Sequence, residues 1–389
     1  MQLQLLSHDE SQRRLLKVRS QMDKSGIAAV LICDNANLYY LTGRVFAGYV
    51  WIPLKGEPVY FVKRPVEMEG DNVVSIRKPE QIPASTGIMP PEVLGLELDT
   101  VPYSMVTRLR SLFPEARLAD ASAVMRQARA VKTDEEVRLI GESAMHQDHV
   151  YSLVPSYFRE GMRDFELQVE IERASRLDGC LGLFRVSGPS MELFMGNVLA
   201  GDNADEPSPY DFAMGGAGMD PSLPVGCNGS IIKSGTTVMV DVNGNYTGYM
   251  SDMTRTYYLG EIAQLARKAH QLSIDICRRL EREGTPGAEA RSLYQIAEDM
   301  VTEAGLHEYF MGHRQKAGFI GHGVGIEINE LPVIAPRSRD LLQVGNVIAL
   351  EPKFVIPGTG AVGIENTYVV TPDGLRRLTD APEQLTSLI

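Results

Sequence analysis

Two periods of hydrophobic and polar positions alternate along the first part of the chain. Apolar runs with the length and β-branched content of strands occur at residues 27–33, 59–63 and 73–77. Apolar positions three or four apart, the spacing of amphipathic helices, occur at residues 10–25, 101–112 and 119–128. This alternation predicts an α/β domain with a mixed or parallel sheet.

The pattern changes at residues 128–136, where ARAVKTDEE precedes a long helical stretch. Thr133 can cap this helix, because Glu136 stands three residues later at the capping-box position. We expect the helix to continue to about Tyr157 and to open a second domain. The chain then divides into an amino-terminal α/β domain, residues 1–128, and a second domain, residues 129–389.

Residues 188–229 break the periodic pattern with a high density of Gly, Pro, Asp and Ser. A loop of this length inside a compact domain is usually functional or disordered. Its aromatic and methionine side chains favour an ordered loop. We expect a lid or substrate wall, with a purely structural excursion as the alternative.

Two hairpins dominate the remaining sequence. The apolar runs 236–242 and 253–259 are joined by a turn rich in Asn and Gly, and a second hairpin joins 346–356 to 361–370 across PGTG. Between the two hairpins, apolar positions occur with the spacing of amphipathic helices. Each hairpin carries two acidic residues, which suggests a pseudo-twofold construction.

Composition excludes several partner classes. The net charge of −12 and the pI near 5.2 argue against nucleic acid or an anionic membrane, since both require a basic face. The four cysteines are scattered without CxxC pairing and are expected to be reduced. The first residues lack the order of a secretory signal, so we expect a cytoplasmic protein.

Four carboxylates in the hairpins need a partner. Asp241 lies in an apolar strand, where an unpaired carboxylate would cost several kcal/mol. Asp252 should lie roughly opposite it on the neighbouring strand, and the same reasoning pairs Glu351 with Glu365 across the second hairpin. Because clustered carboxylates repel one another, a pair of divalent ions would stabilise the group.

A histidine completes this set. His322 stands between two glycines, so the backbone leaves room for a bound group. Any one of the five residues alone would be explained as a hydrogen-bonded buried acid or a core histidine. Together they predict a two-metal site. Carboxylates with one imidazole suit manganese first, with cobalt, iron or zinc as alternatives.

The order Asp, Asp, His, Glu, Glu closely resembles the pita-bread metallopeptidase family, which includes aminopeptidase P, prolidase, methionine aminopeptidase and the metal-free creatinase. The GHGVG, EP and GIE segments match its pattern. NLYYLTG at residues 37–43 and ARAVKTDEEVRLI at 128–140 resemble signatures of the prolidase and aminopeptidase P branch. The resemblance implies a creatinase-like α/β domain followed by a pita-bread catalytic domain.

The resemblance also implies roles for the five residues. Asp241 and Asp252 would bind one metal ion, His322 the other, and Glu351 and Glu365 would complete the site. Glu365 would bridge both ions. Glu351 would in addition be the general base that takes a proton from the attacking water.

Several family residues are replaced in this chain. Pro224 and Asn329 stand where proline-specific members carry histidines that bind substrate and shuttle protons. Gly363 replaces an arginine, and Asn366 replaces an aspartate, near the last ligand. These replacements weaken the prediction of proline specificity. Arg255 follows Asp252 by three residues, so we expect its side chain on the opposite face of the strand from Asp252, in a structural ion pair.

The sequence therefore predicts a metal-dependent hydrolase similar to Xaa-Pro aminopeptidases and dipeptidases, acting on a small peptide and forming a homodimer by analogy. One alternative keeps the fold and metals but acts on a small non-peptide amide or zwitterion, as creatinase-, ectoine-hydrolase- or lyase-like relatives do. A second alternative is a non-catalytic binding module.

Overall fold

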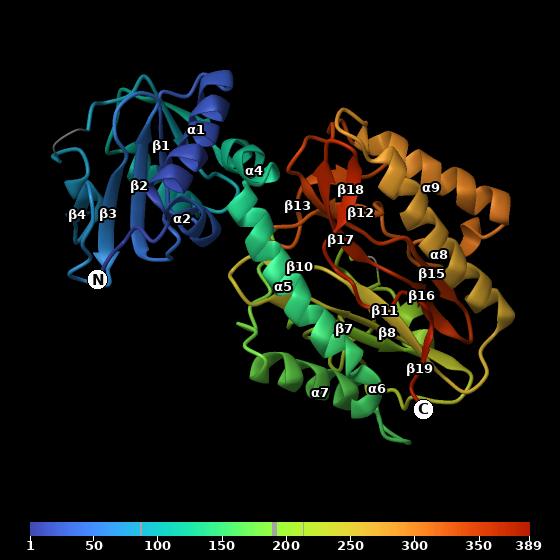
Figure 1. Ribbon diagram of the computed structural model, residues 1–389. Helices are drawn as coiled ribbons and strands as arrows, with labels where there is room; N and C mark the ends of the chain where they lie inside the picture. Colours follow the sequence, from blue (N-terminus) through green and yellow to red (C-terminus); the bar gives the residue numbers. More distant parts are fainter. Residues whose placement is uncertain (86–87, 189–192, 213) are drawn as a thin grey trace. The chain divides into compact units, whose positions relative to one another are not determined.

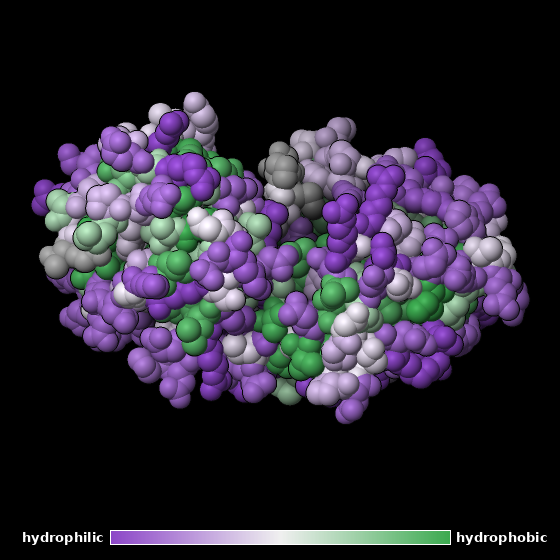
Figure 2. Space-filling model, turned by 90° about the horizontal axis from the view of Figure 1, so that it is seen from above, coloured by the Kyte–Doolittle hydropathy of each residue, from purple (hydrophilic) through white to green (hydrophobic). Residues whose placement is uncertain are grey.

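The computed structural model describes residues 1–85, 88–188, 193–212 and 214–389. These residues form two compact units, Met1–Arg129 and Ala130–Ile389 (Figure 1). None of the helices in the described residues combines the length and the apolar character needed to cross a membrane. The face drawn in Figure 2 is mainly hydrophilic with small hydrophobic patches, as expected for a chain in which 23% of residues are charged.

The amino-terminal unit is a six-stranded mixed sheet with helices, as the sequence predicted. The strand order is β4-β3-β2-β1-β5-β6, with antiparallel pairs at β1–β2 and β2–β3 and parallel pairs elsewhere. The strands are β1 (Ala29–Ile32), β2 (Ala47–Pro53), β3 (Val59–Arg64), β4 (Val73–Ser75), β5 (Val93–Leu96) and β6 (Arg117–Asp120). The helices are α1 (His8–Lys24), α2 (Asn35–Thr42), α3 (Tyr103–Arg110), α4 (Ser122–Ala130) and the short 3-10 helix η1 (Pro79–Gln81).

The second unit contains two larger sheets and two short ribbons. The four-stranded sheet has the order β19-β11-β8-β7, the five-stranded sheet has the order β13-β12-β14-β17-β18, and β9–β10 and β15–β16 form the ribbons. The strands are β7 (Gly196–Ala200), β8 (Thr236–Val242), β9 (Gly244–Asn245), β10 (Met250–Ser251), β11 (Thr254–Leu259), β12 (Gly321–Gly323), β13 (Glu330–Ile334), β14 (Val347–Leu350), β15 (Lys353–Ile356), β16 (Gly360–Gly363), β17 (Asn366–Thr371), β18 (Gly374–Arg377) and β19 (Thr386–Ser387).

Helices cover the outer faces of these sheets (Figure 1). They are α5 (Asp134–Ser152), α6 (Val154–Tyr157), α7 (Asp164–Leu177), α8 (Gln264–Glu283), α9 (Ala290–Ala304), and the short 3-10 helices η2 (Gly201–Asp205) and η3 (His307–Tyr309). One apolar core lies between α5–α7 and the four-stranded sheet, and another lies between α8–α9 and strands β14–β17. The opposite, inner faces carry a smaller apolar cluster together with acidic side chains; the apolar residues are Leu199, Ala204, Met214, Met239, Val355 and Ala361.

Helix α5 begins as predicted and ends earlier than predicted. The Thr133 side chain accepts a hydrogen bond from Glu136 N, and Glu136 accepts one from Thr133 N in return. The helix ends at Ser152, and the short helix α6 follows Leu153. Pro155 accounts for the interruption, because proline lacks an N–H and clashes with the preceding turn.

The second hairpin is bent at both strands, whereas the sequence predicted two continuous strands. Pro352 separates β14 from β15, because it cannot donate to a ladder. Opposite it, Gly363 has φ +134°, and a Cβ there would lie 2.9 Å from the Pro352 carbonyl oxygen. Glu351 and Glu365 stand at these two bends.

Part of the region predicted as a long loop is a strand. Strand β7 is buried and pairs antiparallel with β8, followed by η2. Gly196 permits the pairing, because a Cβ there would lie 2.1 Å from the Asp241 carbonyl oxygen. The prediction of an unbroken loop over 188–229 was therefore wrong for this part, while residues 189–192 and 213 lie outside the described residues.

Candidate metal centre

The five residues singled out in the sequence lie together in the second unit. Asp241 lies in β8, Asp252 precedes β11, His322 is in β12, Glu351 follows β14 and Glu365 precedes β17. All five line one pocket between the inner faces of the two sheets. The five residues thus lie together, and their role as metal ligands stays a prediction.

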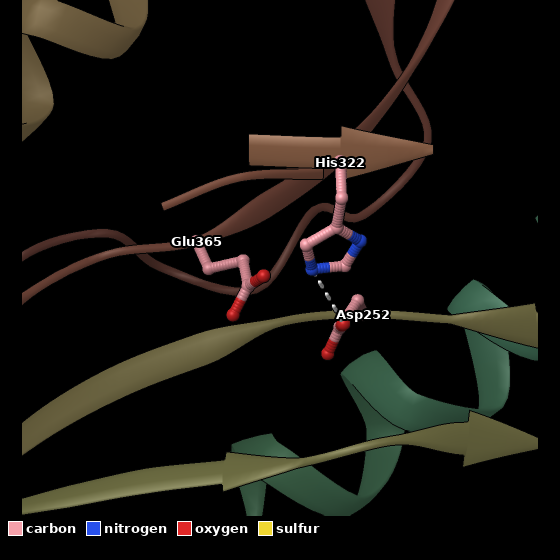
Figure 3. A group of neighbouring side chains, drawn as sticks. All are labelled: Asp252, His322 and Glu365. Atoms are coloured by element: carbon pink, nitrogen blue, oxygen red, sulfur yellow. Dashed lines mark ion pairs between the residues drawn. The ribbon is translucent and has the colours of Figure 1, made fainter. Parts of the chain in front are cut away.

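Asp252, His322 and Glu365 form the first half of the centre. Each offers one ligand atom, and these atoms lie within 4.8 Å of one another. The His322 Nε2 atom is 3.7 Å from Asp252 Oδ2 and 3.4 Å from Glu351 Oε1. The three side chains point toward a common space (Figure 3). Their mixture of oxygen and nitrogen donors fits a divalent transition-metal ion.

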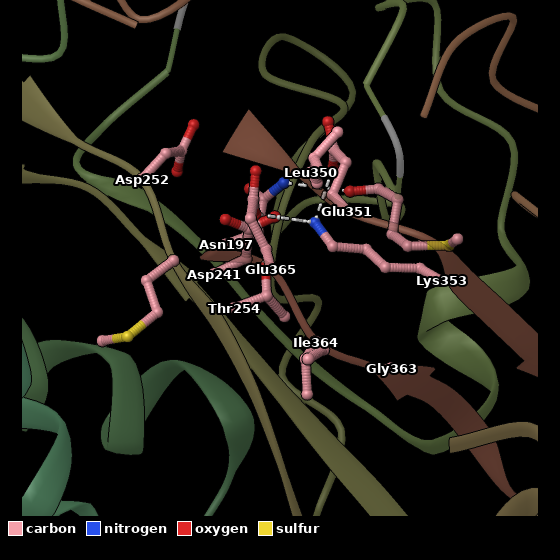
Figure 4. Close-up of polar contacts among 12 residues, drawn as sticks. Asn197, Asp241, Asp252, Thr254, Leu350, Glu351, Lys353, Gly363, Ile364 and Glu365 are labelled. Carbon is pink, nitrogen blue, oxygen red and sulfur yellow. Dashed lines mark hydrogen bonds and ion pairs between the residues drawn. The ribbon is translucent and has the colours of Figure 1, made fainter. Parts of the chain in front are cut away.

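Asp241, Glu351 and Glu365 form the second half, and a lysine lies among them. Lys353 Nζ donates to Glu351 Oε2 at 2.7 Å, to Asp241 Oδ2 at 2.9 Å and to Glu365 Oε2 at 3.1 Å (Figure 4). The lysine side chain is 0% exposed. This half therefore already holds a cation supplied by the chain itself.

Neighbouring hydroxyl and guanidinium groups orient the acids. Thr254 Oγ1 donates to Glu365 Oε2 at 2.7 Å, and Asp252 N donates to Thr367 Oγ1 at 2.9 Å. Arg255 Nη1 donates to the Glu365 carbonyl oxygen at 2.8 Å. The Thr254 and Arg255 contacts fix one carboxylate oxygen and the backbone of Glu365.

Burial and charge shift the pKa values of the group in opposite directions. Burial, and then the Asp241 charge, raise the pKa of Asp252 to about 7. Burial opposes ionisation of Glu351 too, but the Lys353 ammonium and His322 lower its pKa to about 2. Burial opposes protonation of His322, yet Glu351 and Asp252 raise its pKa to about 10. A divalent ion would reverse the shifts of Asp252 and His322, because it favours the ligating carboxylate and the neutral imidazole.

The pocket walls are largely apolar. Its volume of about 570 Å³ includes space open to solvent. The apolar lining comes from two loops and the ends of two strands: Phe184, Val186, Leu193, Phe212, Phe319 and Ile328. Phe319 also packs edge-on against the His322 ring, with centroids 5.9 Å apart.

The two positions that replace family histidines have different surroundings. Asn329 lines the pocket and is bonded to Ser187, since Asn329 Oδ1 accepts from Ser187 N and Nδ2 donates to Ser187 O, both at 2.7 Å. Pro224 is absent from the described residues that line the pocket, and its carbonyl oxygen accepts from Ser208 Oγ. Asn329 thus holds the 184–187 wall in place.

The other replaced residues are structural. Asn366 Oδ1 accepts from Arg255 Nη2 at 2.8 Å, and its Nδ2 donates to Glu383. Gly363 permits the bend opposite Pro352. Instead of the predicted ion pair, Arg255 donates through Nε and Nη2 to the Ala381 carbonyl oxygen, while the Glu383 carboxylate of the same segment pairs with Arg278 and Arg377.

Lys353 is the functional residue that sequence reasoning missed. A signal was present, since Lys353 follows Glu351 by two positions and residues two apart in extended chain share a face. A lysine in the run KFVI also requires an acidic partner if that run is buried.

Comparison with known proteins matches both units. The model of metallopeptidase family M24 matches residues 138–372, and that of the Creatinase/Prolidase N-terminal domain matches residues 14–131. An Xaa-Pro dipeptidase of Pyrococcus horikoshii is 26% identical over 385 residues, covering 97% of this chain and 99% of that protein. One of Pyrococcus furiosus is 27% identical over 379 residues, covering 96% of this chain and 99% of that protein.

Solved structures agree with the sequence matches. The structure of an Xaa-Pro dipeptidase from Bacillus anthracis has a TM-score of 0.80 and 25% identity, covering 97% of this chain and 99% of the other. An X-Pro aminopeptidase from Thermotoga maritima has the same fold, with a TM-score of 0.77 and 19% identity, covering 96% of this chain and 99% of the other. The prediction of a creatinase-like domain followed by a pita-bread domain is confirmed.

Proposed function

The chain belongs to metallopeptidase family M24, and on that premise we propose that it hydrolyses the peptide bond of Xaa-Pro dipeptides or of short peptides with proline in second position. The observation that supports this best is the convergence of Asp252, His322, Glu351 and Glu365 on one pocket. Relatives called Xaa-Pro dipeptidase, similar over nearly the whole chain, supply the substrate class.

We propose that Asp252, His322 and Glu365 bind a divalent ion, manganese first, and that Asp241, Glu351 and Glu365 form a second cation position. Such an ion supplies activation of a water molecule and polarisation of the substrate carbonyl. Glu351 Oε1 faces His322 at 3.4 Å, while Oε2 is held by Lys353. Glu351 Oε1 is therefore the atom proposed to accept the proton of the attacking water.

The apolar walls would hold the substrate side chains and exclude water from the reacting bond. Phe319 stands beside His322, and Phe184 and Ile328 line the same pocket. A prolyl ring fits such a surface, because it carries no side-chain polar group that would need a partner. The Asn329–Ser187 pairing keeps the wall ordered before substrate binds.

Proline release from Gly-Pro, Ala-Pro and Leu-Pro tests this function, with Gly-Ala and Leu-Ala as controls, in metal-free protein and after addition of manganese or cobalt. Manganese-dependent turnover confined to the proline peptides is expected. Glu351→Gln should reduce kcat by about 10²-fold or more, the range for a general base. The matched variant Glu308→Gln, at an exposed glutamate outside the pocket lining, should retain activity. Residual activity within about tenfold of the original after Glu351→Gln would refute its role as base.

A small non-peptide amide is the second candidate, favoured by one observation. Among the described residues that line the pocket, His322 is the single histidine, so a second imidazole that shuttles protons to a leaving amine is missing there. A substrate whose leaving group departs without being protonated would not need a second histidine. Metal-loaded protein that is inert on every Xaa-Pro peptide but releases amine from small acyl amides would select this candidate.

A homodimer is also proposed, by likeness to proteins with this amino-terminal domain. Light scattering on the purified chain of 42.9 kDa would then give about twice that mass. A monomeric mass at micromolar concentration would contradict it.

A further inference from the structure

Lys353 lies where a cation of the centre would lie. Its ammonium group has three N–H donors, and they reach carboxylate oxygens of three different residues at 2.7, 2.9 and 3.1 Å: Glu351, Asp241 and Glu365. The side chain has no exposed surface. All donors of a buried ammonium are thus used inside the candidate metal centre (Figure 4).

The same three residues form one of the two groups able to hold an ion, with ligand atoms within 4.8 Å of one another. Oxygens bind a catalytic divalent ion at about 2.0–2.2 Å. An ion at this position would therefore lie within van der Waals distance of Nζ and would repel it at close range. Ion and ammonium exclude each other here.

The lysine cannot easily leave. It begins strand β15, whose residue Lys353 pairs with Gly363, and its carbonyl oxygen accepts from Met311 N at 2.9 Å. Withdrawal of Nζ would break three charge-assisted hydrogen bonds while the stem stays buried. Such bonds are roughly twice as strong as those between neutral groups.

The carboxylates divide their oxygens between two positions. Glu365 Oε2 accepts from both Lys353 Nζ and Thr254 Oγ1, which leaves Oε1 for the side of Asp252 and His322. Glu351 likewise gives Oε2 to Lys353, while Oε1 lies 3.4 Å from His322 Nε2. This is the arrangement of a two-cation centre in which one cation is an ammonium group.

We propose that Lys353 replaces one of the two metal ions, and that the centre binds a single divalent ion through Asp252, His322 and Glu365. The proposal rests on the proposed function only in requiring that the remaining group binds metal. Lys353 is a positioning residue: it orients Glu351 and Glu365 and neutralises part of their charge without contacting the reacting bond.

Metal stoichiometry tests the proposal directly. Purified protein is stripped with chelator, reloaded with excess manganese, desalted and analysed by inductively coupled plasma mass spectrometry. One manganese per chain is expected. Lys353→Ala, which opens the second position and frees its three carboxylates, should bind two. Lys132→Ala removes another buried lysine, paired with Glu330 outside the pocket lining, and should still bind one.

Electron paramagnetic resonance gives an answer that does not depend on the variants folding. The unaltered chain in excess manganese should give the spectrum of isolated Mn(II) ions, whereas two ions sharing Glu365 would be magnetically coupled. Two ions per unaltered chain with a coupled spectrum would overturn the proposal, as would one ion per chain in a folded Lys353→Ala variant. Absence of Xaa-Pro hydrolysis with one ion bound would defeat the proposed function and leave this inference standing.

Discussion

Replacement of Arg255 by methionine should destabilise the second unit and weaken metal binding together. The guanidinium is buried and makes five hydrogen bonds: two to Ala381 O, one each to Thr254 O and Glu365 O, and one to Asn366 Oδ1. Methionine fills similar volume but offers no donor. The variant therefore loses the hydrogen bonds that hold the backbone around Glu365.

The magnitude follows from the acceptors left behind. A buried acceptor without a partner costs about 1–3 kcal/mol. If two of the four acceptors stay unpaired, Arg255→Met costs about 2–6 kcal/mol. A unit of this size loses roughly 2–4 °C in Tm for each kcal/mol, so Tm should fall by at least about 4 °C.

Far-UV circular dichroism melts, recorded with chelator and with manganese, measure the effect, and isothermal titration measures manganese affinity. Arg255→Lys serves as the control, because a lysine keeps the charge but offers fewer donors, and its Tm should lie between those of Arg255→Met and the unaltered chain. A Tm within 1 °C of the original, or unchanged manganese affinity in a destabilised variant, would refute the link between Arg255 and Glu365.

Three further predictions concern other parts of the chain. Burial raises the pKa of Glu97 to about 7 from 4.5, so its contribution of about 3 kcal/mol to stability is present below pH 4.5 and lost as pH rises through 7. The midpoint of urea unfolding, followed through the single tryptophan, Trp51, should fall over that pH range. In Glu97→Gln the midpoint should depend less on pH, and an unchanged pH dependence would contradict this. Asn329→Ala removes two hydrogen bonds to Ser187, worth about 1–3 kcal/mol together. The value of kcat/KM should therefore fall by about 5-fold or more without loss of metal. Unaltered kinetics would show that other contacts hold the pocket wall at residues 184–187. Chelator should lower the Tm of the second unit by roughly 5–10 °C relative to manganese at about 100 times its Kd, and equal Tm values would count against a metal centre.

Strong periodic signals made much of the fold predictable. The Thr133–Glu136 capping box marks the start of α5, and the apolar runs mark β8 and β11. The sequence pattern did not predict strand β7, which lies in a glycine-rich stretch. Its pairing depends on the close approach of Gly196 to the Asp241 carbonyl oxygen, a tertiary contact that local pattern does not reveal. The bends at Pro352 and Gly363 likewise result from pairing between strands rather than from local pattern.

The acidic residues of the candidate site could be predicted because a buried carboxylate is destabilising unless a cation or a hydrogen bond compensates it. Acids in apolar strands require compensation wherever they occur, and this requirement brought Asp241, Asp252, Glu351 and Glu365 into one prediction. The identity of the compensating cation was not contained in that argument. Lys353 and metal ions can neutralise the same carboxylates, and only the folded structure shows that the lysine reaches Asp241, Glu351 and Glu365.

Anomalous X-ray diffraction at the manganese edge, on crystals grown with manganese, shows directly whether the pocket binds metal and how many ions it holds. We expect one peak, bounded by Asp252, His322 and Glu365, with the Lys353 ammonium still bonded to Asp241 and Glu351. A pocket without any anomalous peak in the presence of excess manganese would contradict the assignment of these residues as a metal centre.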